Sequence, residues 1–118
     1  MNVLVLGASP KSDRYSYKAV ELLRKHGHDV IAIGLNPGMI GDTSIQSEIP
    51  TDIPYDTVTV YLSAQNQKDF YYLIPRLKPR RVIFNPGAEN PEWEQDLHRL
   101  GIETEQACTL VLLNTGQF

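Results

Sequence analysis

Short runs of apolar residues alternate along the chain with longer segments in which apolar positions recur at helical spacing. The first run, residues 3–6, is continuously aliphatic, which is typical of a strand buried on both faces of a parallel sheet. Residues 17–26 then carry apolar side chains three and four positions apart, and Gly27 follows where a helix would end. The amino-terminal part of the chain therefore predicts a βα unit.

The same alternation continues to the end of the chain. We expect further strands at residues 29–33, 57–62, 81–84 and 102–105, and further helices at residues 65–77 and 91–100. Residues 39–55 contain Pro50 and Pro54, which favour an irregular segment with at most a short strand or turn near residues 44–48. The apolar run at residues 109–113 is too short to distinguish a sixth strand from a buried helix.

Strands that alternate with helices through short loops indicate a doubly wound α/β fold of the Rossmann type. We predict about five parallel strands in the order 3-2-1-4-5, with residues 57–62 as the third strand, in a three-layer α/β/α arrangement. The length of 118 residues and the hydrophobic content of 42% suit a single domain over residues 1–118.

Composition narrows the classes of partner. A formal net charge of −3 provides no basic field for nucleic acid. The single cysteine, Cys108, cannot form an internal disulfide, and no apolar run approaches the roughly 18 residues of a membrane span. We therefore expect a cytoplasmic protein with neither nucleic acid nor membrane as a partner, while a homodimer or a partner protein stays open.

The loop after the first predicted strand carries the clearest chemical signal. Gly7 permits a tight turn, and the loop then runs through serines and the basic residues Lys11 and Arg14 into a helix. Backbone N–H groups at the start of such a helix, together with hydroxyl groups and positive charges, are suited to bind a phosphate. The loop therefore predicts a small-molecule, nucleotide-type ligand.

Two common nucleotide motifs are absent from the sequence. In a dinucleotide fingerprint that began at Gly7, Ala8 and Lys11 would stand in place of the second and third glycines. The second predicted strand ends in Gly34, Leu35 and Asn36 rather than in the acidic residue that would hold a ribose. No Walker A sequence occurs, so nicotinamide cofactors and nucleotide triphosphate hydrolysis are disfavoured.

Several segments together resemble a known family. They are residues 5–10 (VLGASP), 14–17 (RYSY), 36–37 (NP), 61–63 (YLS), 85–90 (NPGAEN) and 107–111 (ACTLV). In combination these segments resemble the CoA-binding domain family, a Rossmann-like module similar to the N-terminal domain of the succinyl-CoA synthetase α subunit. The resemblance covers nearly the whole chain and implies CoA or acyl-CoA as the ligand.

The resemblance also implies which residues form the site. The loop that would face the CoA pyrophosphate and open the following helix consists of Gly7, Ala8, Ser9, Pro10, Lys11, Arg14, Tyr15 and Ser16. The adenosine end would lie near Asn36, Pro37 and Gly38, and the pantetheine would pass Leu62, Ser63, Pro86, Gly87, Ala88, Glu89 and Asn90. Many relatives place a lysine after the second-strand proline to meet a phosphate, whereas Gly38 and Met39 stand there in this chain.

The sequence contains no evident pair of catalytic acid and base, and no metal ligands are assigned. Glu89 is interpreted as a carboxylate that orders its loop rather than as a base, and Cys108 as a small buried residue rather than a partner of the CoA thiol. We therefore expect a standalone binding module. The alternatives are an NAD(P)-dependent or thioester-handling enzyme, and a regulatory protein that has lost the ligand and uses residues 110–113 as a dimer contact.

Overall fold

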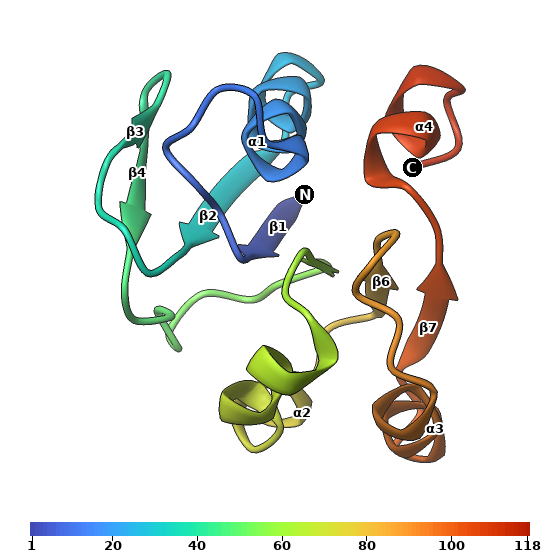
Figure 1. The fold of residues 1–118 in the computed structure, drawn as a ribbon. Helices are drawn as coiled ribbons and strands as arrows, with labels where there is room; N and C mark the ends of the chain where they lie inside the picture. Colours follow the sequence, from blue (N-terminus) through green and yellow to red (C-terminus); the bar gives the residue numbers. More distant parts are fainter.

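The computed structural model describes all residues from 1 to 118 and places a seven-stranded sheet between two layers of helices (Figure 1). The strands are β1 (Asn2–Leu6), β2 (Asp29–Ile33), β3 (Met39–Ile40), β4 (Thr43–Gln46), β5 (Thr57–Val60), β6 (Arg81–Phe84) and β7 (Glu103–Gln106). The helices are α1 (Tyr15–Lys25), the 3₁₀ helix η1 (Ala64–Phe70), α2 (Leu73–Leu77), α3 (Pro91–Arg99) and α4 (Thr109–Asn114).

The sheet has the order β3-β4-β2-β1-β5-β6-β7, and every neighbouring pair is parallel except the β3–β4 hairpin. This confirms the predicted Rossmann-like α/β fold. The predicted strand order is wrong in one respect, because β5 pairs with β1 on the side away from β2 and is not the outer neighbour of β2. That outer position belongs to β4, a strand of four residues that ends before Pro50.

Helices cover both faces of the sheet, α1 and α4 on one and η1, α2 and α3 on the other (Figure 1). Side chains alternate between the two faces along a strand, so β1 contributes to both cores. Leu4 and Leu6 belong to the core that contains Trp93, whereas Val3 and Val5 belong to the core that contains Leu23. Burial of β1 on both faces explains its uninterrupted aliphatic sequence.

The helix predicted over residues 65–77 is divided into η1 and α2 in the structure. A continuous α-helix would need the Pro75 nitrogen to donate to the Tyr71 carbonyl, which proline cannot do. As the third residue of the short helix α2, Pro75 lies where a backbone N–H has no intrahelical acceptor, so it is tolerated there.

Residues 109–113, for which a strand and a helix were both open, belong to helix α4. Leu112 and Leu113 are buried within the chain, and Val111 is exposed. The residues considered for a dimer contact are therefore largely part of the protein's own core. Neither α4 nor any other helix combines the length and apolar character needed to cross a membrane.

Candidate functional site

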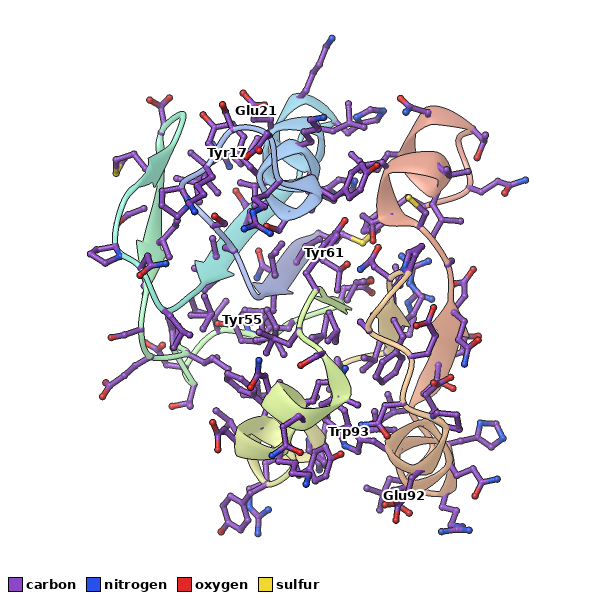
Figure 2. The ribbon with its side chains drawn as sticks, viewed as in Figure 1. Tyr17, Glu21, Tyr55, Tyr61, Glu92 and Trp93 are labelled. Carbon is purple, nitrogen blue, oxygen red and sulfur yellow. The ribbon has the colours of Figure 1, made fainter.

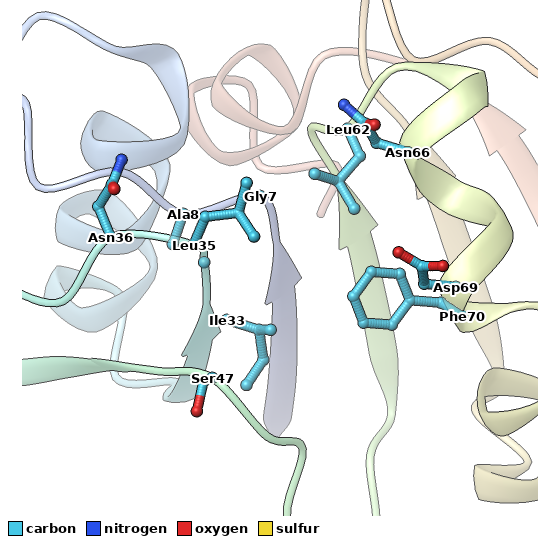
Figure 3. A pocket seen from close by; sticks show the side chains of 11 residues that line it. Gly7, Ala8, Ile33, Leu35, Asn36, Ser47, Leu62, Asn66, Asp69 and Phe70 are labelled. Carbon is cyan, nitrogen blue, oxygen red and sulfur yellow. The ribbon is translucent and has the colours of Figure 1, made fainter.

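A cleft of about 300 Å³ opens at the carboxyl ends of β1, β2 and β5 (Figure 3). The chain leaves β1 toward the α1 face and leaves β5 toward the η1 face, so the two loops diverge at this point. Such a divergence is where open α/β sheets bind their ligands. The cleft is lined by Gly7, Ala8, Ile33, Gly34, Leu35, Asn36, Ser47, Leu62, Asn66, Asp69 and Phe70.

The floor of the cleft is a close contact between the loops that follow β1 and β2. The backbone N–H groups of Gly7 and Ala8 both donate to the Ile33 carbonyl, over 2.9 and 2.8 Å. A Cβ atom on Gly34 would overlap the Ala8 carbonyl oxygen, and Gly7 has a φ of +93°, which favours glycine. Glycines at these positions therefore let two backbones meet beneath the cleft.

The contact beneath the cleft uses amides that were expected to face a phosphate. Because the Gly7 and Ala8 N–H groups are already bonded to Ile33, they are not free to face a pyrophosphate. The N–H groups of Tyr15, Ser16 and Tyr17, in the first turn of α1, have no acceptor within the protein. The unbonded amides of this segment therefore lie at the start of α1 rather than at Gly7 and Ala8.

Two positively charged side chains lie on the loop that leads into α1. Lys11 and Arg14 are exposed and take part in no ion pair. Tyr15 follows them and is 69% exposed. The loop thus offers unpaired positive charge next to the unbonded amides of the helix, a combination that attracts phosphate groups.

Other members of the same loop support its shape. The Ser9 hydroxyl accepts a hydrogen bond from the Lys11 N–H over 3.2 Å, and Ser16 is buried. Pro10 lies against the loop that follows β2, where a Cβ on Gly38 would be only 2.7 Å from the Pro10 Cβ. These residues hold the two loops together at one side of the cleft.

Of the three residues predicted after the second strand, Asn36 lines the cleft. Pro37 is exposed outside it, and Gly38 contributes the contact with Pro10. On the opposite wall, Leu62 lines the cleft, and Ser63 is exposed at the start of η1. The structure therefore brings Gly7, Ala8, Asn36 and Leu62 of the predicted set together around one cavity.

The predicted loop of residues 85–90 does not line the cleft but docks against η1. The buried Gln67 amide donates to the carbonyls of Leu62 and Ala88 over 2.8 and 2.7 Å. Asn90 donates to the Gln67 side chain over 2.9 Å, and its own side-chain oxygen accepts from the N–H of Trp93 at the start of α3. The side chain of Asn90 is thus occupied by contacts within the protein.

The outer part of the same loop is exposed. Pro86, Gly87 and Glu89 face solvent, while Ala88 is buried. The Glu89 carboxylate accepts a hydrogen bond from the Gly87 N–H over 3.0 Å, so it orders the turn in which it lies.

A buried polar network connects β5 and β6 to the start of α4. The Asn85 amide donates to the Thr59 hydroxyl over 2.6 Å, and its oxygen accepts from the Thr109 N–H over 2.8 Å. The Thr59 and Thr109 hydroxyls are themselves 2.7 Å apart. Burial raises the pKa of the neighbouring Tyr61, which is labelled in Figure 2. Cys108 is half-buried, forms no disulfide and directly precedes Thr109 in the chain. It does not line the cleft.

A charged cluster lies at the opposite edge of the sheet, where β5 and β6 begin. A hydrogen bond from Arg80 lowers the pKa of Asp56, and the two side chains approach to 3.0 Å. Burial lowers the pKa of Arg81. The Arg81 guanidinium lies 4.7 Å from the centre of the Phe118 ring and donates a hydrogen bond to the Thr57 hydroxyl. The pKa shifts of Asp56 and Arg81 therefore arise from packing where β5 and β6 begin, at the edge of the sheet opposite the cleft.

The sequence analysis missed part of the cleft lining, in particular Ser47 and the η1 residues Asn66, Asp69 and Phe70. The sequence feature that could have identified this wall of the cleft is the pair Asn66 and Asp69. Both are polar, and they lie three positions apart just beyond the end of a strand.

Comparison with known proteins decides the family. The chain matches the CoA binding domain over residues 1–114, nearly its full length. It belongs to the CoA-binding domain family. The family resemblance inferred from the glycine loop and the two Asn-Pro loops is therefore confirmed.

This CoA-binding domain is similar to several solved structures. One, described as an uncharacterised protein, is 47% identical over 99% of this chain and 97% of that chain, with a TM-score of 0.95. The structure of cell-free ID.343 from Thermus thermophilus is 24% identical over 99% of this chain and 90% of that one, with a TM-score of 0.82. A hypothetical protein from Pyrococcus horikoshii OT3 is 18% identical over 96% and 81%, with a TM-score of 0.83. The last two share the fold alone, and no curated protein matches the chain.

Proposed function

We propose that this domain binds CoA or an acyl-CoA across the carboxyl edge of its sheet and acts as a standalone binding module. The observation that carries the proposal is that Gly7 and Ala8, which line the cleft, begin the loop that leads into α1. This loop carries the unpaired cations Lys11 and Arg14, and the first turn of α1 has unbonded amides. Membership of the CoA-binding domain family supports CoA as the ligand that uses both features.

In this proposal the diphosphate lies over the first turn of α1. The N–H groups of residues 15–17 donate to its oxygens, and Lys11 and Arg14 balance its charge. Gly7 and Ala8 contribute by shape, because their amides are bonded to Ile33.

The size of the cleft limits how much of the ligand it can enclose. A volume of about 300 Å³ is at the lower end of the roughly 300–1,000 Å³ found for small-molecule sites, so only one part of a CoA molecule enters it. We assign that part to the adenosine end, beside Asn36 and Pro37. The pantetheine would then pass Leu62, Ser63 and the exposed face of the loop of residues 86–90.

Binding without turnover is the simplest role for this arrangement. Among the residues that line the cleft, Asp69 alone has an ionisable side chain. General acid–base catalysis needs a group positioned on the reacting atom and tuned by its surroundings. The cleft provides recognition groups instead, namely amide, hydroxyl and apolar surface.

Isothermal titration calorimetry with CoA, acetyl-CoA and NAD tests the proposal. We expect CoA and acetyl-CoA to bind and NAD to bind more weakly. The substitutions Lys11→Ala and Arg14→Ala should each weaken CoA binding by about tenfold, the usual effect of losing a charge-assisted contact. Lys25→Ala, which removes an exposed cation from the last turn of the same helix, is the matched control and should have no effect.

Two results would overturn the proposal. Tight binding of NAD without binding of CoA would favour the enzyme alternative. Failure of all three ligands to bind would favour a regulatory protein that retains the fold without the ligand.

A further inference from the structure

The cleft contains a single charge, and that charge is negative. Asp69 on η1 lines the cleft opposite Asn36, which follows β2 (Figure 3). Its carboxylate forms no ion pair, and no hydrogen bond from the protein reaches it. The neighbouring Lys68 is exposed and is not part of the lining. Asp69 is therefore free to act on whatever enters the cleft.

The two halves of the proposed site have opposite electrostatic character. Lys11 and Arg14 supply positive charge at the start of α1, outside the cleft, whereas the cleft wall carries only the Asp69 carboxylate. Gly38, which follows Asn36 and Pro37 and does not line the cleft, lies against Pro10 and has no side chain, so it brings no cation toward the ligand. An anionic group in the cleft would meet repulsion with no positive side chain in the lining to offset it.

We propose that Asp69 makes the cleft selective for an adenosine without a phosphate on its ribose, so that dephospho-CoA binds at least as tightly as CoA. The inference rests on the proposed function, which assigns the adenosine end to the cleft. CoA differs from dephospho-CoA only in a 3′-phosphate, which carries nearly two negative charges at neutral pH. The ligand class is thus an adenosine diphosphate ester of pantetheine with free ribose hydroxyls.

The same carboxylate gives a reason for favouring the unphosphorylated ribose. An ionised carboxylate only accepts hydrogen bonds, and the ribose 2′ and 3′ hydroxyl groups are donors. Acidic side chains perform this function for the ribose in dinucleotide-binding sheets, where they come from the end of the second strand. In this chain the end of β2 has no acidic residue, and the carboxylate comes from η1 across the cleft.

The size of the effect follows from the exposure of the site. Asp69 is solvent-exposed, so its repulsion of a nearby phosphate is weakened by water and by salt. We expect it to contribute about threefold to tenfold to the ratio of the CoA and dephospho-CoA dissociation constants at low ionic strength. Raising the salt concentration should reduce this contribution, whereas a purely steric effect would not change.

Titration of CoA and dephospho-CoA into the wild-type protein and three variants tests the inference. Asp69→Asn should lower the ratio of the CoA to the dephospho-CoA dissociation constant by about threefold to tenfold, and Asp69→Lys should lower it further. Asp42→Asn removes an exposed carboxylate from the β3–β4 turn, outside the cleft, and should leave the ratio unchanged. Thermal unfolding of each variant establishes that the fold is intact.

The possible outcomes separate this inference from the proposed function. If wild-type protein binds both ligands and Asp69→Asn leaves their ratio unchanged, the inference fails and CoA binding stands. An equal loss of affinity for both ligands would also overturn it, because Asp69 would then contact only what they share. If the wild-type protein binds neither ligand, the proposed function fails and this inference fails with it.

Discussion

Replacing Gly34 with alanine tests the close contact beneath the cleft. An added Cβ would overlap the Ala8 carbonyl oxygen and lie 3.1 Å from the Ala8 carbonyl carbon and 3.2 Å from the Ile45 Cγ2 atom. The oxygen and carbon are backbone atoms, so no rotation of a side chain can relieve the overlap. The loop after β1 would have to move away from β2 by roughly 1 Å to restore ordinary contact distances.

That movement determines the magnitude of the effect. The hydrogen bonds from Gly7 and Ala8 to the Ile33 carbonyl, now 2.9 and 2.8 Å, would lengthen beyond bonding distance. Each is worth about 0.5–1.5 kcal/mol, and crowding of a packed region costs about 1–3 kcal/mol. We expect Gly34→Ala to lower the free energy of unfolding by about 3 kcal/mol, a large part of the roughly 5–15 kcal/mol of a domain.

Urea denaturation followed by circular dichroism measures this loss, and thermal unfolding should show a fall in Tm of about 10 °C. Gly41→Ala is the comparison, because a Cβ there meets no atom within 4 Å and its cost is limited to the φ of +58°. A loss below about 1 kcal/mol for Gly34→Ala, or below that of Gly41→Ala, would refute the reasoning.

Two further substitutions test the supporting structure. Asn90→Ala removes the cap of α3 and the bond to Gln67, and should lower the free energy of unfolding by about 2–3 kcal/mol in urea denaturation; a loss under about 0.5 kcal/mol would contradict the assigned contacts. The hydrogen bond from Arg80 lowers the pKa of Asp56 in the folded protein below its value in the unfolded chain. The Asp56–Arg80 pair therefore stabilises the folded protein at pH values above the unfolded pKa, and this stabilisation is lost as the pH falls through the folded pKa. Below about pH 5, the free energy of unfolding should therefore change less with pH for Asp56→Asn than for the wild-type protein. Equal changes with pH in the two proteins would contradict the pairing.

Strands whose burial is encoded locally could be predicted from the sequence. The bounds of β2 and β6 coincide with the predicted residues 29–33 and 81–84, because each is a short apolar run with a loop signal on both sides. The helices α1 and α3 were predicted nearly as well, since each has one apolar face and a glycine just beyond its end.

Features that depend on distant partners could not be predicted in this way. The sequence of β4, Thr-Ser-Ile-Gln, is a weak strand signal on its own, and pairing with β2 makes it a strand and fixes the order of the sheet. The use of the Gly7 and Ala8 amides depends on the Ile33 carbonyl, which the fold brings from another strand. The place of Asp69 in the cleft depends on the break of the helix before Pro75 and on the hydrogen bonds by which Gln67 of η1 holds this helix against the loop that contains Ala88.

The two borders of the sheet differ in a way that affects how molecules meet. An unpaired strand at a border can recruit a strand from another chain and so begin aggregation. One border, β3, is only two residues long, and the other, β7, presents the carboxylates of Glu103 and Glu105. A strand that paired along β7 would crowd the ion pairs that Glu103 and Glu105 form with Arg80 and Arg81, and β3 is too short to hold an incoming strand. Continuation of the sheet from one molecule to the next is therefore discouraged at each border, even in concentrated solution.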